Sequence, residues 1–446
     1  MSGLEEVLHE LESRFEVKRV RTPLSVIYEI PAVIKYFDRG PTLVFTRVKE
    51  DVCGVVAANL VNTRSKVMYY LGVGSDEELY RKILDSESKV GKITEVSSHD
   101  YKEIEVNLEK LPVLKYYEGD AGRYVTSAVV IAKDPETGYH NLSVHRILVL
   151  GRDVATLRIV PRHLYTICEH YRQRGITKVP VAVCIGVHPL LLFAASCSPP
   201  FGFSEYHVAS NFMNADVRVC DLGNGVLVPI DSEYVLLGYI DLETLVDEGP
   251  FTDILELYDK VRKQPLLKVE KIYVLRDVPY YHAILPGGAE HKLLMALERE
   301  ARIWNFVRAV VPYVKAVRLT WAGGCWLHAV ISIRKITDGD AKNAIMAAFA
   351  AHPSLKHVIV VDEDIDIDNP EEVEWAIATR FRADRGLVLV QYVRGSTLDP
   401  SAIDQEQGLT TKMGIDATYP RAERRKFEKA RIPINVRELI EKLEVY

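Results

Sequence analysis

The chain has 446 residues, 48% of them apolar and 26% charged, and a formal charge of −6 at pH 7. This length predicts two or three domains, because a single hydrophobic core seldom grows beyond about 250–300 residues. The negative charge argues against nucleic acid as a partner, since binding to phosphates requires a surplus of Lys and Arg, and no apolar run reaches the roughly 20 residues of a membrane span.

Residues 1–112 are predicted to form an N-terminal α/β domain. Residues 4–15 have the three-and-four spacing of an amphipathic helix, 42–45 is a short apolar strand, and 76–84 returns to helix. The first of these segments is acidic and lacks the basic-then-apolar order of a signal peptide, so we expect a cytoplasmic protein. Pro112, which interrupts regular structure, marks the end of this domain.

Residues 113–288 change to short β-rich runs separated by turn residues, with examples at 124–131, 142–150 and 233–240. Recurrent short strands of this kind predict an antiparallel barrel or sandwich rather than βαβ units. Residues 163–174 are expected to form a helix inserted among these strands.

Residues 289–446 alternate between helix and strand, with a long helix at 290–310, and predict a second α/β domain. The chain ends in an amphipathic helix that Asn435 caps, with Glu438 at the capping-box position. The apolar stripe of this helix must be buried, either on the body of the protein or on another subunit. Its members are Val436, Leu439, Ile440 and Leu443.

The first candidate site is the polar run at residues 139–146. On a strand, Asn141, Ser143 and His145 point to one face and Arg146 to the other. Polar side chains on an inner strand need partners, because an unpaired buried polar group costs roughly 1–3 kcal/mol, and a ligand would supply them. The alternative is an exposed edge strand with a solvated polar face.

Two further candidate sites lie where helices begin. At 158–163, arginines beside the N–H groups of a helix start suit a phosphate, although they also fit ordinary charge at a helix end. At 196–206, Glu205 follows a Pro- and Gly-rich loop and, with Asn141 and His163, offers the oxygen and nitrogen ligands that Mg²⁺ or Mn²⁺ prefer. Alone, such a Glu is more often a helix N-terminal residue favoured by the dipole.

The six cysteines contain no CxxC pair and do not indicate zinc.

The fourth candidate site is an acidic loop at residues 247–253. Two carboxylates five residues apart, Glu248 and Asp253, flank a Gly-Pro pair and can act as acid and base beside Arg146. The alternative is a solvated acidic turn.

In chain order, these segments resemble the UbiD-type decarboxylases. The runs that carry the resemblance are 204–206, 248–251, 356–366, 370–376, 394–401 and 414–418. The similarity spans roughly residues 20–430. It implies an N-terminal α/β unit, a central split β-barrel related to flavin-reductase barrels, and a C-terminal α/β domain that mediates oligomerisation.

The resemblance also implies prenylated FMN as the cofactor, with its phosphate held by Mn²⁺, K⁺ nearby, and a flavin prenyltransferase as its supplier. By this resemblance Asn141 and Glu205 are metal ligands, and so is His163, at a position where family members differ. The residues on the flavin-contacting stretches are Val144, His145, Arg146, Arg158, Ile159, Val160, His163 and Leu164.

Arg146, Glu248 and Asp253 match the catalytic Arg–Glu–acid network of the family. Loss of CO₂ from an sp² carbon needs an electron sink, which the prenylated flavin provides, while the protein orients and protonates. Arg146 is expected to hold the departing carboxylate and to keep Glu248 ionised. Asp253, without a cation of its own, is expected to retain a proton and donate it. Thr252 stands where the family usually has Gly, which indicates a loop shaped for a different substrate.

Within the family, the chain looks most like an archaeal branch whose members include the decarboxylase of trans-anhydromevalonate 5-phosphate, which yields isopentenyl phosphate. We therefore expect a carboxy-lyase that acts on this α,β-unsaturated carboxylic acid and forms a homo-oligomer. The alternatives are an aromatic acid such as 4-hydroxy-3-polyprenylbenzoate and, in another class of protein, a non-catalytic flavin-binding function.

Overall fold

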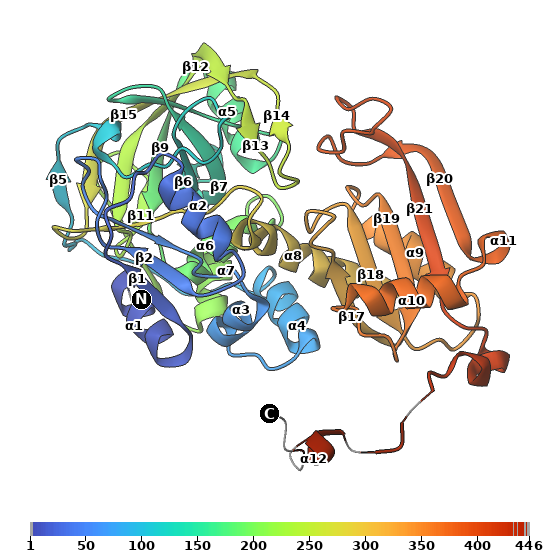
Figure 1. Ribbon diagram of the computed structural model, residues 1–446. Coiled ribbons are helices and arrows are strands. Elements are labelled where there is room, and N and C mark those ends of the chain that lie inside the picture. Colours follow the sequence, from blue (N-terminus) through green and yellow to red (C-terminus); the bar gives the residue numbers. More distant parts are fainter. Residues whose placement is uncertain (1–2, 431, 435, 441–442, 444–446) are drawn as a thin grey trace.

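The computed structural model describes residues 3–430, 432–434, 436–440 and 443. It has an N-terminal α/β unit, a closed antiparallel barrel and a C-terminal α/β domain, which confirms the predicted mixed fold class (Figure 1). The larger body holds the first two parts, and the long helix α8 (Ala289–Arg308) runs from it to the C-terminal domain.

The N-terminal unit is a four-stranded sheet covered by helices. Its strand order is β1 (Val17–Val20), β2 (Thr42–Phe45), β3 (Val55–Ala58) and β16 (Tyr280–His282). Helix α1 (Leu4–Arg14) buries leucines and a valine spaced three or four residues apart, because that spacing brings them to one face. The other helices are α2 (Glu29–Tyr36), α3 (Arg64–Leu71) and α4 (Asp76–Ser86).

Six antiparallel strands form the barrel. In spatial order they are β12 (Tyr234–Glu248), β9 (Lys178–Ile185), β6 (Tyr124–Lys133), β7 (His140–Val149), β8 (Val154–Leu157) and β15 (Arg262–Val274). Pairing of β12 with β15 closes the ring. Strand β7 pairs with β6 from His140 to Leu148 but with β8 only at Ile147–Val149, so the polar run has a strand partner on one side only. Its side chains are buried or half-buried rather than solvated, as the edge-strand alternative would have required.

Short helices and strands surround the barrel. The helices are α5 (His163–Gln173), α6 (Pro189–Ser196), α7 (Glu205–Met213) and a 3₁₀ turn at Leu108–Lys110. The strands are β4 (Ile93–Glu95), β10 (Val217–Asp221) and β11 (Leu227–Pro229) in a small sheet, and β13 (Phe251–Thr252) and β14 (Tyr258–Asp259) in a hairpin. Helix α5 is the insertion that the sequence predicts at 163–174.

The C-terminal domain is a five-stranded mixed sheet with helices on both faces. Its strand order is β17 (Val314–Leu319), β18 (His328–Ile333), β19 (His357–Asp362), β21 (Leu409–Ala417) and β20 (Leu387–Arg394). Its remaining helices are α9 (Asp340–Ala351), α10 (Pro370–Arg380) and α11 (Ala383–Gly386). Residues of α8 and α9 pack on one face and residues of α10 on the other.

Strand pairing and side-chain hydrogen bonds connect the N-terminal unit with the barrel and with α8. Strand β5 (Lys102–Ile104) pairs with barrel strand β15, and β16, which follows the barrel strands in the chain, pairs with β3 of the N-terminal sheet. Glu290 at the start of α8 accepts hydrogen bonds from the backbone N–H groups of Asn59 and Val61, at 3.0 and 2.8 Å. The N-terminal unit and the barrel are therefore joined by strand pairing, and α8 is tied to the N-terminal unit by a side chain; the boundaries at 112 and 288 stay predictions.

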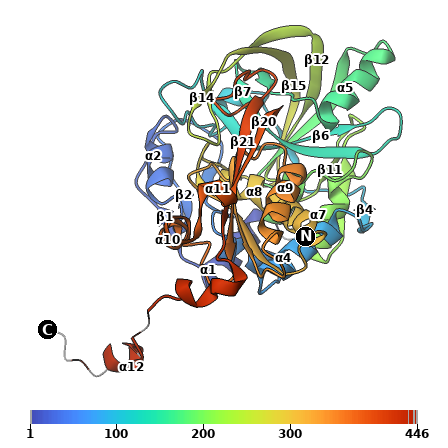
Figure 2. The same ribbon diagram turned by 90° about the vertical axis from the view of Figure 1, so that its right-hand side faces the viewer.

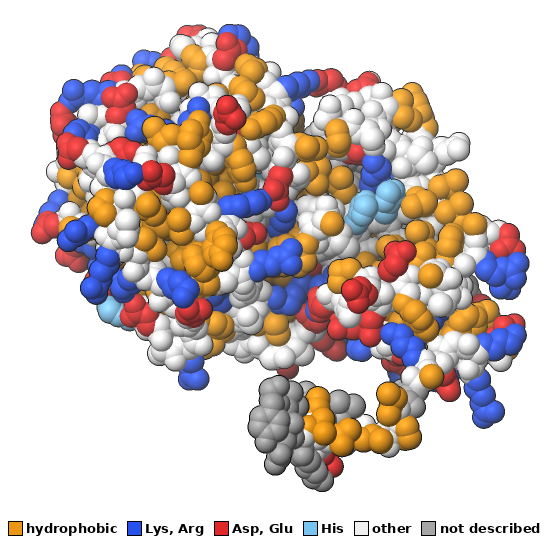
Figure 3. All heavy atoms as spheres, viewed as in Figure 1, with side chains coloured by type: hydrophobic (Ala, Val, Ile, Leu, Met, Phe, Trp, Pro, Cys, Tyr) orange, Lys and Arg blue, Asp and Glu red, His pale blue; other side chains and the backbone are white. Residues whose placement is uncertain are grey.

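The face shown in Figure 3 carries acidic and basic side chains intermingled. Within the described residues, none of the helices combines the length and the apolar character that crossing a bilayer requires.

The C-terminal segment leaves the body of the molecule. After a 3₁₀ turn at Arg421–Phe427, the chain extends away and ends in α12 (Val436–Ile440), as both views show (Figures 1 and 2). Leu439, Ile440 and Leu443 are 45%, 56% and 53% exposed, so this part of the predicted stripe is not buried on its own chain. The predicted cap, Asn435, lies outside the described residues.

We propose that this stripe packs on a neighbouring subunit. A truncation before Ile434 should then lower the particle mass measured by light scattering, because burial of apolar surface is the main force in association. Substitution of Leu439 and Ile440 by Asp should have the same effect, and Glu438→Gln serves as the control. An oligomer of unchanged mass in the truncated protein, or a monomeric wild type, would contradict the proposal.

Candidate active site and cofactor site

A buried ion pair joins two strands of the barrel. Arg146 on β7 donates from Nε to Oε1 of Glu248 at 2.8 Å, and from Nη2 to Oε2 at 2.9 Å. Glu248, at the end of β12, is completely buried, so the solvated-turn alternative is wrong for this residue. Burial alone would lower the pKa of Arg146, but the hydrogen bonds and charge of Glu248 outweigh it and raise the pKa. The two parallel hydrogen bonds therefore hold the pair in a fixed geometry.

Asp253 shares the same guanidinium group. Its Oδ2 lies 3.5 Å from Nη1 of Arg146, and its side chain is 23% exposed. The expectation that Asp253 has no cation is therefore wrong, because Arg146 lies beside Asp253 as well as Glu248. Of the two carboxylates, Asp253 is held at the longer distance and is the one open to solvent.

Asp259 is a third carboxylate at this centre, and the sequence analysis missed it. The β13–β14 hairpin brings its Oδ2 to 3.0 Å from Nη2 of Arg146, while Arg262 Nη1 lies 2.5 Å from Oδ1. Arg158, predicted to contact flavin, has its Nε 4.0 Å from Asp259 Oδ2. Burial opposes ionisation, but Arg262 and Arg146 outweigh it and lower the pKa of Asp259. Only the hairpin register brings Asp259 to Arg146, so spacing along the chain offers no signal.

A histidine that the sequence analysis also missed borders the centre. The backbone N–H of Gly287 donates to Nδ1 of His291 at 3.1 Å, which places the proton of the neutral ring on Nε2. Burial lowers the pKa of His291, and the negative charge of Asp253 opposes this shift. The His291 ring is thus neutral, with its proton on Nε2, and close enough to feel the charges of Asp253 and Arg146.

The predicted metal ligands lie together at the start of α7. Asn141 Nδ2 donates to both oxygens of Glu205, at 3.1 and 3.2 Å, and the backbone N–H of Leu142 donates to Oε2 at 2.7 Å. His163 Nδ1, at the start of α5, lies 3.8 Å from Glu205 Oε1. The carboxylate of Glu205 therefore contacts strand β7 of the barrel. Glu205 is also the first residue of α7, as the helix-terminus alternative requires.

This donor set fits a hard divalent cation. Glu205 is buried, and burial raises its pKa. The described residues place no Lys or Arg within ion-pair distance of it, so a metal ion would supply the missing positive charge. Turning the Asn141 amide over would present its oxygen without a change of shape. No three His, Cys, Asp or Glu side chains of the described residues form a metal cluster, because one of the three predicted ligands is an amide.

The predicted flavin-contacting residues lie on β7 and on the segment between β8 and α5. His145 donates from Nδ1 to the carbonyl oxygen of Arg158 at 2.9 Å and accepts at Nε2 from Ser143 Oγ at 2.8 Å. Burial lowers the pKa of His145 to about 4, so the ring is neutral and fixed in one tautomer. The hydrogen bonds of Ser143 to Asn141 and His145 confirm that these three side chains share one face.

The apolar members of this set differ in environment. Val144, Ile159 and Val160 are half-buried, whereas Leu164 is buried in the barrel core. The backbone N–H of Ile159 donates to Gln264 Oε1 at 2.8 Å, which ties the segment to β15.

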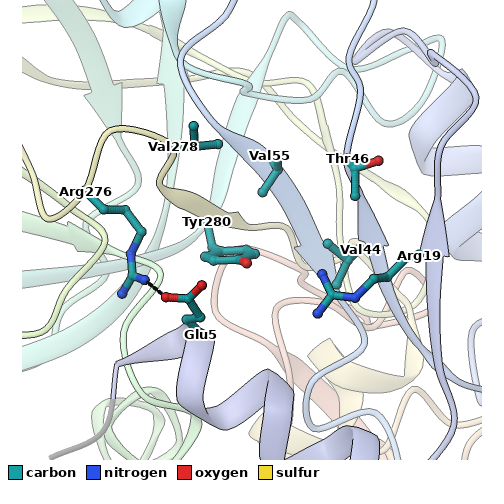
Figure 4. A pocket seen from close by; sticks show the side chains of 8 residues that line it. All are labelled: Glu5, Arg19, Val44, Thr46, Val55, Arg276, Val278 and Tyr280. Carbon is teal, nitrogen blue, oxygen red and sulfur yellow. Dashed lines mark hydrogen bonds and ion pairs between the residues drawn. The ribbon is translucent and has the colours of Figure 1, made fainter.

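A separate pocket of about 360 Å³ lies on the N-terminal unit (Figure 4). It is lined by Glu5, Arg19, Val44, Thr46, Val55, Arg276, Val278 and Tyr280. Its two arginines already pair with carboxylates of the chain, Arg276 with Glu5 and Glu233 and Arg19 with Glu12. None of the predicted site residues borders it.

The closed barrel thus holds one arginine against three carboxylates, and a buried Glu–Asn–His group at the start of α7. Three family models match the chain: the N-terminal, Rift-related and C-terminal domains of 3-octaprenyl-4-hydroxybenzoate carboxy-lyase, at residues 8–86, 88–289 and 292–417. The chain belongs to the UbiD family.

Curated relatives and solved structures agree. The chain is 47% identical over 412 residues to an anhydromevalonate phosphate decarboxylase from Aeropyrum pernix, with 92% of each chain covered. It is 41% identical to one from Methanothermobacter thermautotrophicus, covering 92% of this chain and 96% of the relative. The structure of the UbiD-class enzyme HmfF from Pelotomaculum thermopropionicum in complex with FMN superposes with a TM-score of 0.93 at 35% identity, covering 98% of this chain and 100% of that one.

Proposed function

We propose that this enzyme removes CO₂ from trans-anhydromevalonate 5-phosphate and yields isopentenyl phosphate. The observation that carries the proposal is the centre of Arg146, Glu248 and Asp253 in a chain whose curated relatives are named anhydromevalonate phosphate decarboxylases. The similarity covers 92% and 96% of the lengths of these two relatives.

The residues at the centre have distinct roles in this proposal. Glu248 occupies Nε and Nη2 of Arg146, which leaves Nη1 to bind the substrate carboxylate. Asp253, beside Nη1 and partly exposed, donates a proton to the carbon that has lost CO₂. Prenylated FMN, when bound, supplies the electron-accepting chemistry that cleavage of the C–C bond requires.

The cofactor phosphate is proposed to be held through Mn²⁺. Asn141, His163 and Glu205 have the oxygen and nitrogen donors for that ion, and the FMN and prenylated-FMN complexes of HmfF support the cofactor assignment. K⁺ is proposed to lie nearby, and a flavin prenyltransferase to supply the prenylated flavin.

The substrate is tested directly with purified, flavin-loaded protein. Incubation with trans-anhydromevalonate 5-phosphate should yield isopentenyl phosphate and one equivalent of CO₂, measured by NMR and gas analysis. 4-Hydroxy-3-polyprenylbenzoate, the alternative substrate, should give no product. Turnover of the aromatic acid alone would replace the proposed substrate, and absence of turnover with either acid in protein that retains flavin would favour a non-catalytic function.

The cofactor anchor is tested by removing its ligands. Asn141→Ala and Glu205→Ala should each purify folded but with little manganese or flavin, measured by elemental analysis and absorbance, because both remove a donor from the same ion. Glu243→Ala, at an exposed position of β12, is the control. Wild-type manganese and flavin content in both variants would contradict the assignment of Asn141 and Glu205 as metal ligands.

The proton donor is tested with a nearly isosteric change. Asp253→Asn should keep its flavin but lose at least about two orders of magnitude in turnover, the scale of one general acid. Asp247→Asn is the matched control, since Asp247 is exposed and pairs only with Lys263 among the described residues. A loss below about tenfold in flavin-loaded Asp253→Asn would transfer the role to Glu248 or to water.

A further inference from the structure

All three carboxylates at Arg146 come from one short segment, residues 248–259. Glu248 is the last residue of β12, and Asp253 and Asp259 lie in the hairpin of β13 and β14 that follows (Figure 1). Each strand of this hairpin has only two residues. Because so short a pairing is weak by itself, the positions of these carboxylates depend on the contacts that hold the segment from outside.

Thr252 lies between two residues that contact Arg146. The guanidinium carbon of Arg146 lies 4.7 Å from the ring centroid of Phe251, and Asp253 Oδ2 lies 3.5 Å from Nη1. Successive side chains of an extended chain point to opposite sides, so the side chain of Thr252 is directed away from Arg146. It is 2% exposed, and its hydroxyl contacts Asp120.

Asp120 accepts two hydrogen bonds from Thr252. Its Oδ1 accepts from the backbone N–H of Thr252 at 2.8 Å and from the hydroxyl at 3.0 Å. Its Oδ2 accepts from the backbone N–H of Tyr117 at 3.0 Å. Asp120 is 3% exposed, and among the described residues no Lys or Arg lies within ion-pair distance of it. Thr252 therefore supplies two of the hydrogen bonds that compensate a buried carboxylate for the loss of water.

These hydrogen bonds matter because burial disfavours the charged form of Asp120. Burial raises the pKa of Asp120, and the hydrogen bonds from Thr252 and Tyr117 oppose this shift. A buried acceptor that loses its donor costs free energy, and a charged acceptor costs more than a neutral one. Movement of Thr252 away from Asp120 is therefore unfavourable, which makes this contact a restraint on the backbone of the hairpin.

The residues on either side of Asp120 bind the same segment. The backbone N–H of Ala121 donates to the carbonyl of Pro250 at 2.9 Å, and that of Gly119 donates to the hydroxyl of Tyr258 at 3.1 Å. A Cβ on Gly119 would lie 2.5 Å from the ring of Tyr258, so this close approach requires glycine. Three consecutive residues, with Asp120 in the middle, thus hold the segment that carries the carboxylates.

We propose that Asp120 and Thr252 are positioning residues of the decarboxylation, whose hydrogen bonds fix the backbone before Asp253 and hold its carboxylate beside Nη1 of Arg146. This inference rests on the proposed function, in which Asp253 donates the proton, and adds to it the residues that set the geometry of that donation. The geometry matters for rate, because a misplacement of about 1 Å can cost on the order of a hundredfold.

Thr252→Val tests the hydroxyl with little change of shape, because it removes one donor to Asp120 and keeps the backbone N–H. In flavin-loaded protein it should lower kcat by about tenfold, the effect of a misplacement smaller than 1 Å, and leave KM near the wild-type value. Thr252→Ser keeps the donor and should restore most of kcat. Thr156→Val is the matched control, since Thr156 is a buried barrel threonine whose hydroxyl donates to the carbonyl of Pro265 at 2.9 Å.

The same change in an Asp253→Asn background separates positioning from a general structural effect. If Thr252 acts through Asp253, the double variant should be no slower than Asp253→Asn alone, because the group that Thr252 positions is already absent. Asp120→Asn should lower kcat in the same way, since an amide has one acceptor oxygen where a carboxylate has two.

Three results would overturn this inference alone: unchanged kcat in Thr252→Val, failure of Thr252→Ser to restore it, or a further loss in the double variant. Near wild-type turnover in flavin-loaded Asp253→Asn would instead overturn the proton-donor role. A wild type that turns over neither acid would overturn the proposed function. This inference falls with either of those two.

Discussion

The buried ion pair between Arg146 and Glu248 is the interaction on which the site depends. Strands β7 and β12 lie opposite each other in the ring, with β6 and β9 between them on one side and β8 and β15 on the other. Each charge removed from water costs several kcal/mol, which two parallel hydrogen bonds and close approach must offset. The pair is therefore a constraint on the closed barrel, since any change in strand register would leave a charge buried without a partner.

The same pair determines what the neighbouring carboxylates can do. Glu248 uses two of the guanidinium nitrogens, Asp259 approaches one of these, and Asp253 faces the third at 3.5 Å. Arg262 and Arg158 balance the extra charge of Asp259. Asp253 is thus the carboxylate with the weakest hold on Arg146, which is the property required of a group that exchanges protons during a reaction.

Helix α8 couples this centre to the rest of the molecule. Its first turn places Glu290 against the backbone of the N-terminal unit, and His291 accepts a hydrogen bond from the backbone N–H of Gly287. Two turns later it brings Arg299 to the boundary with the C-terminal domain, where Trp326 covers the guanidinium. One helix therefore links the N-terminal unit to the boundary with the C-terminal domain.

The sequence by itself determined the elements and much of the ligand chemistry. The predicted helix at 290–310 is observed at Ala289–Arg308, and strand alternation placed Asn141 and His145 on one face of β7, with Arg146 directed elsewhere. These are local properties, because the 3.6-residue and two-residue periods are carried by consecutive side chains. Similarity to the UbiD family then supplied the candidate pairing of Arg146 with Glu248, which spacing alone left open.

Only the tertiary structure decided which charges meet. Asp259 joins Arg146 through a hairpin, and Glu248 reaches it from a strand 102 positions away in the printed numbering. The sequence analysis assigned Asp253 no cation for the same reason. A charged side chain has no periodicity that reveals its partner, and whether it is paired depends on barrel closure and domain packing, which bring together distant parts of the chain.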